Sequence, residues 1–431
     1  MAGSPFLLRA RVVVPVSRPP LDDGAVFVSG GRLADVGRWP DLASRHAGSP
    51  VIDLGEVILL PGLINAHCHL DYTGMAAGIP PQKSFSDWIK AILAHKAAWS
   101  YTDFAASWVS GARMLLRNGV TTVVDIEAVP ELLPEVWAAT PLRVISALEM
   151  TGIRSGKEPA HILAEALAAF PDPPDDRKQA ALSPHSLYAT RRELLTLANA
   201  ATAERHWLLT MHVAESQEEF DMFVHRRGPL HDWLAGQRDL SDCNGATPVQ
   251  CLERLGLLTS RLLAVHVNCL GEGDAARLAQ AGAHVVHCPR SHDYFHHPAF
   301  PLAELTAAGV NICLGTDSLA SVRGTNRSAI ELNLFRDMQV MSAAFRTLAP
   351  EQIVRMATIN GARAIGRTGD SGELSPGAAA DLIAIPWHGP RQEIFEAILR
   401  NDKPVAASFI AGEQVFPTAA TRLYGPPPSV P

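Results

Sequence analysis

The middle of the chain alternates between apolar runs and amphipathic segments, and this alternation restricts the fold more than any other feature. Helical periodicity marks residues 104–118, 191–205 and 271–281. Continuous apolar strands separated by helices are typical of a parallel sheet that is covered on both faces. Eight such strands predict a (β/α)8 TIM barrel, an α/β fold. The predicted strands are 57–66, 120–126, 142–148, 180–183, 208–213, 262–267, 284–288 and 310–315.

The two ends of the chain have a different residue pattern from the middle. Short β-prone runs separated by Pro and Gly occupy 6–16, 25–28 and 51–54, and similar runs follow at 381–385 and 405–410. We therefore expect the two ends to pair into one small β-domain. The predicted boundaries are 1–56 and 371–431 for this domain and 57–370 for the barrel.

Charge and hydropathy exclude several classes of protein. The net charge is -7 and no basic run is present, so we expect no nucleic-acid partner. No apolar run approaches the ~18 residues of a membrane span, and the first 15 residues do not resemble a signal peptide. The six cysteines are scattered without a CxxC pair, which fits a reducing compartment. These features predict a cytoplasmic protein without a membrane partner.

Polar side chains are concentrated at the ends of the predicted strands. In a TIM barrel the chemistry takes place at the carboxyl ends of the strands, where the following loops form one mouth. The residues at or just after these ends are His67, His69, His185, His212, Glu215, His266, His287 and Asp317.

His67 and His69 form an alternating pair on the first strand, so both imidazoles point to one side. Neutral imidazoles with one carboxylate suit zinc or a similar first-row ion. Seventeen histidines will also produce chance pairs, and any single one could be a core residue with satisfied hydrogen bonds. Because five of these six histidines and an aspartate end predicted strands where one barrel mouth would be, the metal site is the better hypothesis.

Three residues have alternative interpretations. Glu215 could move a proton between a water and a leaving group, or it could be a first-turn acid of a helix at 216–224. Asp317 could ligate a metal or cap the next helix. His266 could ligate the metal or orient the water, and residue chemistry alone does not separate these roles.

Six stretches resemble the amidohydrolase superfamily, in its cytosine-deaminase-like and chlorohydrolase–aminohydrolase branch. They are 60–69 (LPGLINAHCH), 211–216 (MHVAES), 286–291 (VHCPRS), 314–321 (LGTDSLAS), 357–366 (ATINGARAIG) and 372–382 (GELSPGAAADL). The resemblance spans nearly the whole chain in order. It implies a barrel with a composite β-sandwich built from both termini, and it makes a homodimer reasonable.

The resemblance also assigns roles around one divalent ion, with zinc as the first choice and iron(II) or manganese(II) as alternatives. By resemblance the ligands are His67, His69, His212 and Asp317. The expected reaction is hydrolytic deamination of an amino-substituted heterocycle, a purine nucleoside-like small molecule, by an activated water. Asp317 and His266 would deprotonate and orient this water, and Glu215 would protonate the ring nitrogen before ammonia leaves.

The substrate pocket is expected around Trp88, His185, Ser318 and Arg290. Trp88 could equally be a core residue, and whether His292 and the loop 290–297 touch the substrate is open. No Glu lies between Trp88 and residue 103, where methylthioadenosine/S-adenosylhomocysteine deaminases carry a ribose-binding Glu.

Other stretches resemble the aminodeoxyfutalosine-deaminase-like group more closely, so an aminodeoxyfutalosine-type or adenosine-type substrate is expected. Alternatives within the superfamily are a chlorohydrolase and a cyclic amide or formimino hydrolase. A non-catalytic barrel scaffold is the alternative from another class.

Overall fold

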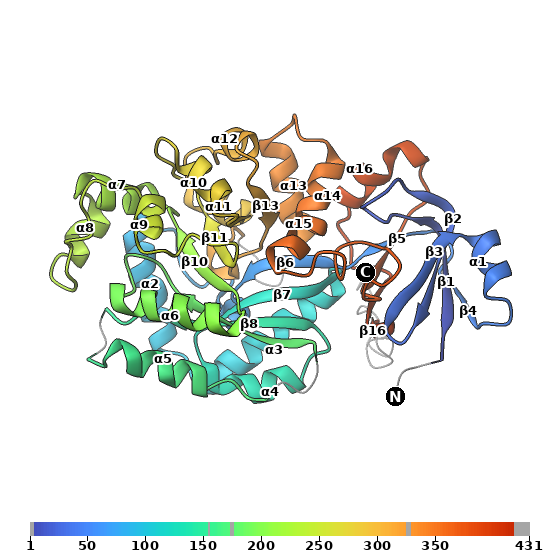
Figure 1. Cartoon of the computed structure of the whole chain (residues 1–431), viewed down its shortest axis with the longest axis horizontal. Coiled ribbons are helices and arrows are strands. Elements are labelled where there is room, and N and C mark those ends of the chain that lie inside the picture. The colour runs from blue at the N-terminus through green and yellow to red at the C-terminus, as the bar shows by residue number, and fades with distance from the viewer. Residues whose placement is uncertain (1–3, 154–155, 173–175, 325–328, 418–431) are drawn as a thin grey trace, which may run out of the picture.

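A computed structural model of the chain describes residues 4–153, 156–172, 176–324 and 329–417. Within them the chain forms a barrel surrounded by helices, with a smaller sheet at its side (Figure 1). The end of the predicted C-terminal segment 371–431, residues 418–431, lies outside the described residues.

The barrel consists of eight parallel strands in sequence order, which confirms the predicted fold class. The loop after the last strand returns to the first strand, where the amides of Thr316 and Asp317 each donate to the carbonyl of His67 at 3.1 Å. The strands are β6 (Leu63–Cys68), β7 (Val120–Glu127), β8 (Arg143–Met150), β9 (Lys178–Pro184), β10 (Leu209–Val213), β11 (Leu262–His266), β12 (His284–His287) and β13 (Asn311–Leu314).

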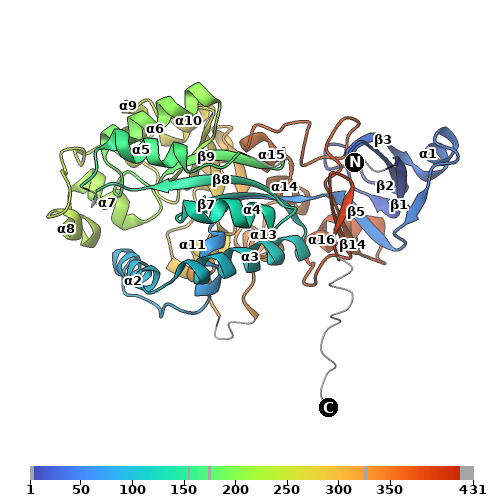
Figure 2. The same cartoon turned by 90° about the horizontal axis from the view of Figure 1, so that it is seen from below.

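Helices surround these strands, and three of them occupy the segments with helical periodicity (Figure 2). These three are α3 (Tyr101–Arg117), α6 (Arg192–Arg205) and α10 (Asp274–Gln280). The others in the barrel region are α2 (Phe85–Ala97), α4 (Leu133–Ala138), α5 (Pro159–Ala168), α7 (Gln217–His225), α8 (Pro229–Leu234), α9 (Pro248–Arg254), α11 (Pro289–Phe295), α12 (Leu302–Ala307), α13 (Leu334–Ala344), α14 (Pro350–Met356) and α15 (Ile359–Ala364).

The predicted first barrel strand, 57–66, is two strands in the structure. β5 (Val57–Pro61) belongs to the terminal sheet, and β6 begins the barrel after Gly62. A Cβ on Gly62 would lie 2.0 Å from the hydroxyl of Thr121, so the chain changes sheets where only glycine fits. Because both strands are buried, both are rich in apolar residues, and the sequence pattern does not mark where one ends and the next begins.

The terminal sheet combines strands from both ends of the chain, as predicted. Its order is β16-β15-β14-β5-β1-β2-β3, and β4 also pairs with β1. Leu8, Leu59, Leu382 and Phe409 pack in its core, so neither end could bury this face alone. The strands are β1 (Phe6–Val13), β2 (Leu21–Ser29), β3 (Arg32–Arg38), β4 (Val51–Asp53), β14 (Leu382–Pro386), β15 (Ala407–Ile410) and β16 (Glu413–Phe416), with helices α1 (Trp39–Arg45) and α16 (Ile394–Leu399) nearby.

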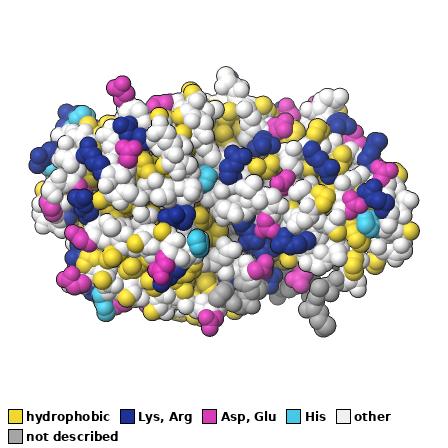
Figure 3. Space-filling model, in the orientation of Figure 1, with side chains coloured by type: hydrophobic (Ala, Val, Ile, Leu, Met, Phe, Trp, Pro, Cys, Tyr) yellow, Lys and Arg dark blue, Asp and Glu magenta, His cyan; other side chains and the backbone are white. Residues whose placement is uncertain are grey.

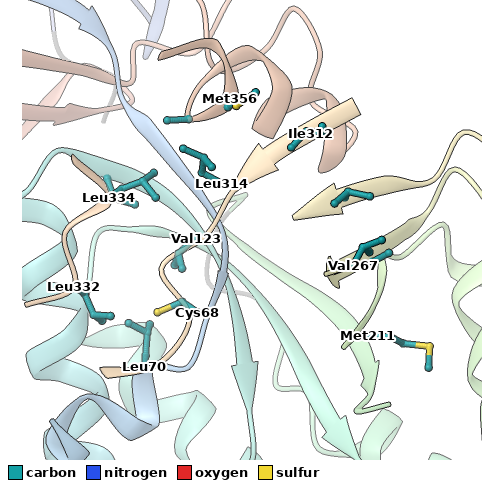
Figure 4. Packing of buried hydrophobic residues seen from close by; sticks show 14 of the residues in the cluster. Cys68, Leu70, Val123, Met211, Val267, Ile312, Leu314, Leu332, Leu334 and Met356 are labelled. Carbon is teal, nitrogen blue, oxygen red and sulfur yellow. The ribbon is translucent and has the colours of Figure 1, made fainter. Parts of the chain in front are cut away.

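The cysteines of the chain are packing residues. All six are unpaired and buried. Cys68 lies between the two histidines of the first strand, yet its side chain packs with Leu70 and Val123 in the main apolar cluster (Figure 4). Burial raises the pKa of its thiol well above the usual value, which disfavours the thiolate that nucleophilic catalysis needs.

The surface shows no segregation of charge on the face drawn in Figure 3, where acidic and basic side chains are interspersed. On this face the charges are therefore spread rather than gathered. Among the described residues, no helix is long and apolar enough to cross a membrane.

Candidate metal and active site

Three buried imidazoles converge at the carboxyl ends of β6 and β10. His67 and His69 come from the end of β6, and His212 comes from β10. One ring nitrogen of each lies within 4.8 Å of the others. The ring of His67 meets those of His69 and His212 edge-on, with centroids 5.0 and 4.9 Å apart. The predicted cluster is therefore assembled by two strands that are far apart in the sequence.

The chemistry of this cluster fits a divalent cation. Both ring nitrogens of His67 and Nδ1 of His69 are buried without a hydrogen-bond partner among the described residues. Burial and then His67 lower the pKa of His69 to about 3, and burial and then His185 hold the pKa of His212 well below its usual range. Neutral imidazoles with free lone pairs are metal ligands, and a cation would satisfy groups that are costly to leave unpaired.

Asp317 completes the cluster from the loop after β13. Its Oδ1 lies 3.6 Å from Nε2 of both His67 and His69. Its Oδ2 accepts hydrogen bonds from the hydroxyls of Ser291 at 2.6 Å and Ser321 at 3.0 Å. Burial alone would raise the pKa of Asp317, but the neighbouring imidazoles hold it well below its usual range. One oxygen is thus fixed by the two serines while the other faces the histidines.

The structure shows neither Asp317 as a helix cap nor Glu215 as a first-turn acid. Ser318, not Asp317, is the N-cap of the short helix at Leu319–Ser321. Glu215 precedes Ser216, the N-cap of α7, and so lies outside the first turn of that helix. Both carboxyl groups are instead buried at the barrel mouth.

Gly315 permits the close approach that brings Asp317 to the histidines. A Cβ at this position would lie 2.8 Å from the carbonyl oxygen of His67 and 2.9 Å from its Cβ. These are backbone or near-backbone atoms, so they cannot move aside without shifting β6. The sequence Leu-Gly-Thr-Asp therefore needs its glycine for contact between the first and last strands.

We expect Gly315→Ala to separate the last strand from His67 and to weaken metal binding. The added methyl group would displace the loop that carries Asp317, as overpacking in a dense interior typically costs about 1–3 kcal/mol. Measurement of bound metal per chain and of the melting temperature checks this, with Gly366→Ala as a control because nothing lies near a Cβ there. Since Gly366 has a φ of +71°, that control should lose some stability but no metal. Equal metal loss in both variants would contradict the expectation.

Glu215 and His266 lie next to each other beside the imidazole cluster. Oε1 of Glu215 is 3.5 Å from Nε2 of His266, and both side chains are buried. Burial, then the charges of Asp317 and Glu219, raise the pKa of Glu215 well above its usual value. The surroundings therefore favour the protonated form of Glu215 and the ionised form of Asp317. Environments that separate two carboxyl groups in this way are typical of acid–base pairs in active sites.

Backbone strain gathers at the same place. Ala214, His266, Val267 and Asp317 all have positive φ, between 47° and 74°. Such conformations are costly for residues other than glycine and cluster at functional sites in known structures. These four residues lie at the ends of three barrel strands, around one mouth of the barrel.

The site opens into a cavity at the barrel mouth. Of the predicted site residues, seven line it: Trp88, His69, His185, His212, Glu215, Asp317 and Ser318. Trp88 also packs edge-on against Phe295, with centroids 4.9 Å apart. It therefore serves both as a wall of the cavity and as a packing residue.

A polar network that sequence reasoning missed links the cavity to the imidazoles. Nδ1 of His185 lies 2.8 Å from Oε1 of Glu149, whose Oε2 is 3.6 Å from Nζ of Lys96. Lys96 also donates to the hydroxyl of Tyr72, and that ring stacks on His69 with centroids 5.1 Å apart. Burial would raise the pKa of Glu149, but Lys96 and His185 hold it well below its usual range. Glu149 directly follows the predicted strand 142–148, so a search of strand ends could have found it.

Arg290 is the predicted substrate residue that the structure does not bring to this cavity. Its Nε donates to Asp337 at 2.9 Å and its Nη1 to the carbonyl of Glu331 at 2.9 Å. It lines a different cavity near α13. A buried carboxylate 47 positions away holds the guanidinium, and the local sequence carries no sign of this pairing.

His287 and His292 also stay outside the imidazole cluster. His287 stacks on Phe300 with centroids 3.9 Å apart. Nδ1 of His292 lies 3.0 Å from the side-chain oxygen of Asn268, whose amide donates to the carbonyl of Glu215 at 2.8 Å. Asn268 therefore links His292 to the backbone of Glu215.

Comparison with known proteins assigns the chain to a family. A model of the amidohydrolase family matches residues 58–415, which include the barrel and most of the C-terminal strands. The chain belongs to the amidohydrolase family. This confirms the resemblance seen in the sequence motifs, and with it the assignment to hydrolases that act on carbon–nitrogen bonds.

Two curated relatives of this amidohydrolase are nucleoside deaminases. The 5-methylthioadenosine/S-adenosylhomocysteine deaminase of Syntrophobacter fumaroxidans is 30% identical over 401 residues, which cover 86% of this chain and 81% of that protein. The 5'-deoxyadenosine deaminase of Methanothermobacter thermautotrophicus is 27% identical and covers 85% of this chain and 83% of that protein. The first belongs to the subgroup from which this chain departs by lacking a Glu after Trp88.

Solved structures share the fold of this amidohydrolase at lower identity. An adenosine deaminase of Xanthomonas campestris with bound zinc superposes with a TM-score of 0.80 at 24% identity, covering 95% of this chain and 92% of that one. The aminofutalosine deaminase of Helicobacter pylori with methylthio-coformycin gives 0.82 at 21% identity, covering 95% and 100%. The atrazine chlorohydrolase of Arthrobacter aurescens with zinc gives 0.79 at 21%, covering 97% and 98%.

Proposed function

We propose that this amidohydrolase is a zinc-dependent deaminase that releases ammonia from an adenine-type nucleoside. The observation that carries the proposal is the convergence of His69, His212, Glu215 and Asp317 on one cavity. Zinc suits three imidazoles and a carboxylate, and zinc is present in two of the solved relatives in the same fold. The named activities of the sequence relatives support an adenine nucleoside as substrate.

His67, His69, His212 and Asp317 would hold the ion, which supplies Lewis acidity and makes a water nucleophilic near neutral pH. Asp317 would accept a proton from the attacking water, because the neighbouring imidazoles favour the ionised form of its carboxyl group. His266 orients the water from its position 3.5 Å from Glu215. Glu215 would give its proton to the ring nitrogen, so that the carbon bearing the amino group becomes open to attack. The proton taken from the water by Asp317 would then pass to the amino group, and ammonia would leave as the proton of the new hydroxyl returns to Glu215.

His185, Trp88 and Ser318 are proposed to contact the heterocycle, because all three line the cavity beside the imidazoles. Nδ1 of His185 lies 2.8 Å from the carboxylate of Glu149, and its Nε2 lies 3.4 Å from the hydroxyl of Tyr188, another residue of the cavity lining. Adenosine-type and aminodeoxyfutalosine-type compounds both carry the adenine ring, so both are candidate substrates. That the enzyme works as a homodimer stays a prediction.

A substrate panel tests this proposal. Zinc-loaded protein is incubated with adenosine, 5'-deoxyadenosine, 5'-methylthioadenosine, aminodeoxyfutalosine, guanine and a chlorotriazine, while ammonia and chloride are both measured. We expect ammonia from one or more of the adenine nucleosides, in equal amount to the hypoxanthine nucleoside formed. Chloride release without ammonia would favour the chlorohydrolase alternative, and release of neither would favour a barrel without this activity.

A further inference from the structure

Lys96 is the only lysine or arginine among the described residues that line the cavity. It lies in the last turn of α2, at the end of the barrel away from the terminal sheet (Figures 1 and 2). Its side chain is only 21% exposed, although lysine is usually among the most exposed residues. A largely buried ammonium group needs partners, and the two partners of Lys96 both lead to the imidazole cluster.

The first partner is Tyr72, in the short helix Leu70–Met75 that follows β6. Lys96 donates to the Tyr72 hydroxyl, and its Nζ lies 4.6 Å from the centroid of the same ring. The Tyr72 ring in turn stacks on that of His69, with centroids 5.1 Å apart and only 9° between the planes. Lys96 therefore holds one ring of a stacked pair whose other ring belongs to the cluster.

The second partner is Glu149, at the end of β8. Nζ of Lys96 lies 3.6 Å from its Oε2, and its Oε1 lies 2.8 Å from Nδ1 of His185. The carbonyl of His185 accepts from the amide of His212 at 2.8 Å, and the two imidazole rings have centroids 4.5 Å apart. This second path from Lys96 therefore ends at another imidazole of the cluster.

Stacking has particular weight for His69 because its ring lacks another restraint. Metal-ligating histidines usually donate their second ring nitrogen to a carboxylate or carbonyl, which fixes the ring. Nδ1 of His69 is buried and has no hydrogen-bond partner among the described residues. The contact with Tyr72 is therefore positioned to set the orientation of this ring, and Lys96 is positioned to hold Tyr72.

We infer that Lys96 is a positioning residue of the metal site. Through Tyr72 it sets the ring of His69, and through Glu149 and His185 it sets that of His212. The inference rests on the proposed function, in which these two histidines hold zinc. Zinc affinity and turnover then both depend on a side chain of the outer helix that is not itself a ligand.

Lys96→Met tests this dependence, because methionine keeps the length of the side chain and removes its charge. We expect the zinc dissociation constant, measured without substrate by competition with a chelator, to rise about tenfold, as when other groups that orient metal ligands are lost. Lys96→Arg keeps a cation at this position and should keep most of the zinc affinity. Lys90→Met is the matched control on the same helix, since Lys90 is 44% exposed and pairs with Asp87. The control should bind zinc as the unmodified protein does.

A mutant cycle separates positioning from a direct contact between Lys96 and the substrate. In a Tyr72→Phe/Glu149→Gln protein, both paths from Lys96 to the histidines are already cut, although the stacked ring remains. Adding Lys96→Met to this background should change zinc affinity and kcat little, because residues of one network have non-additive effects. A loss as large as in the unmodified background would overturn the inference.

Because zinc affinity is measured without substrate, the inference and the proposed function can fail separately. Unchanged zinc affinity in a folded Lys96→Met protein would overturn the inference and leave the proposed function intact. Weakened zinc binding in Lys96→Met, with no ammonia from any adenine nucleoside in the unmodified protein, would support the inference and refute the proposed substrate. If the unmodified protein binds no zinc, the metal assignment is wrong, and the inference falls with it.

Discussion

Replacement of Glu215 by glutamine should lower kcat by about three orders of magnitude, in line with the loss of a general acid–base group, and leave the bound metal in place. Glutamine keeps the shape of the side chain but cannot give the proton that the raised pKa of Glu215 makes available. The carboxyl group lies 3.5 Å from Nε2 of His266 and is not part of the three-imidazole cluster. The role assigned to it is proton transfer, without metal coordination.

Kinetics and metal analysis of the same preparation check this expectation. Glu219→Gln is a matched control, because Glu219 is also a buried acid in the next turn and accepts from the backbone amide of Glu215 at 2.8 Å. A glutamine oxygen can still accept that bond, and burial, the largest cause of the raised pKa of Glu215, is unchanged, so this control should keep most of the activity. Loss of the metal in Glu215→Gln, or activity near that of the unmodified enzyme, would remove Glu215 from its proposed role.

Replacement of His69 by alanine should abolish metal binding at normal zinc concentrations and with it the activity. The remaining imidazoles and Asp317 come from three separate segments, and one missing ligand leaves an incomplete site. In the unmodified protein, zinc at a hundredfold excess over its dissociation constant should add about 2.7 kcal/mol of stability. This zinc-dependent increment should vanish in His69→Ala.

The melting temperature with and without zinc measures this increment, and the comparison within one variant removes the effect of losing the stacking on Tyr72. His284→Gln is the control, because His284 begins β12 and so lies at the opposite end of the barrel from the site. It should keep both its zinc and its increment. A His69→Ala protein that binds zinc as tightly as the unmodified one would refute the assignment of His69 as a ligand.

The barrel and its imidazole cluster were predictable because their causes are local. A parallel strand that is buried on both faces must be apolar, and β7 and β8 therefore stand out in the sequence. The three imidazoles stand out because barrels display chemistry at strand ends, where His67, His69 and His212 are found. No long-range information was needed for either step.

The features that were missed depend on contacts between distant segments. The change of sheet at Gly62 is decided by Thr121, which the apolar run around Gly62 does not reveal. The orientation of Asp317 depends on Ser291 and Ser321, and the chain Lys96–Glu149–His185 joins a helix, a strand and a loop. Arg290 lies away from the imidazoles for the same reason, since only the fold brings Asp337 to it.

A zinc titration of the metal-free protein tests the central claim most directly. Ammonia release from 5'-deoxyadenosine or 5'-methylthioadenosine is followed while zinc is added in steps, and bound zinc is measured in parallel. We predict that activity is absent at the start, rises in proportion to bound zinc and reaches its plateau at one ion per chain. Ammonia release that is independent of zinc, or a chain that binds one zinc ion in the His67, His69 and His212 cluster and deaminates no adenine nucleoside, would contradict it.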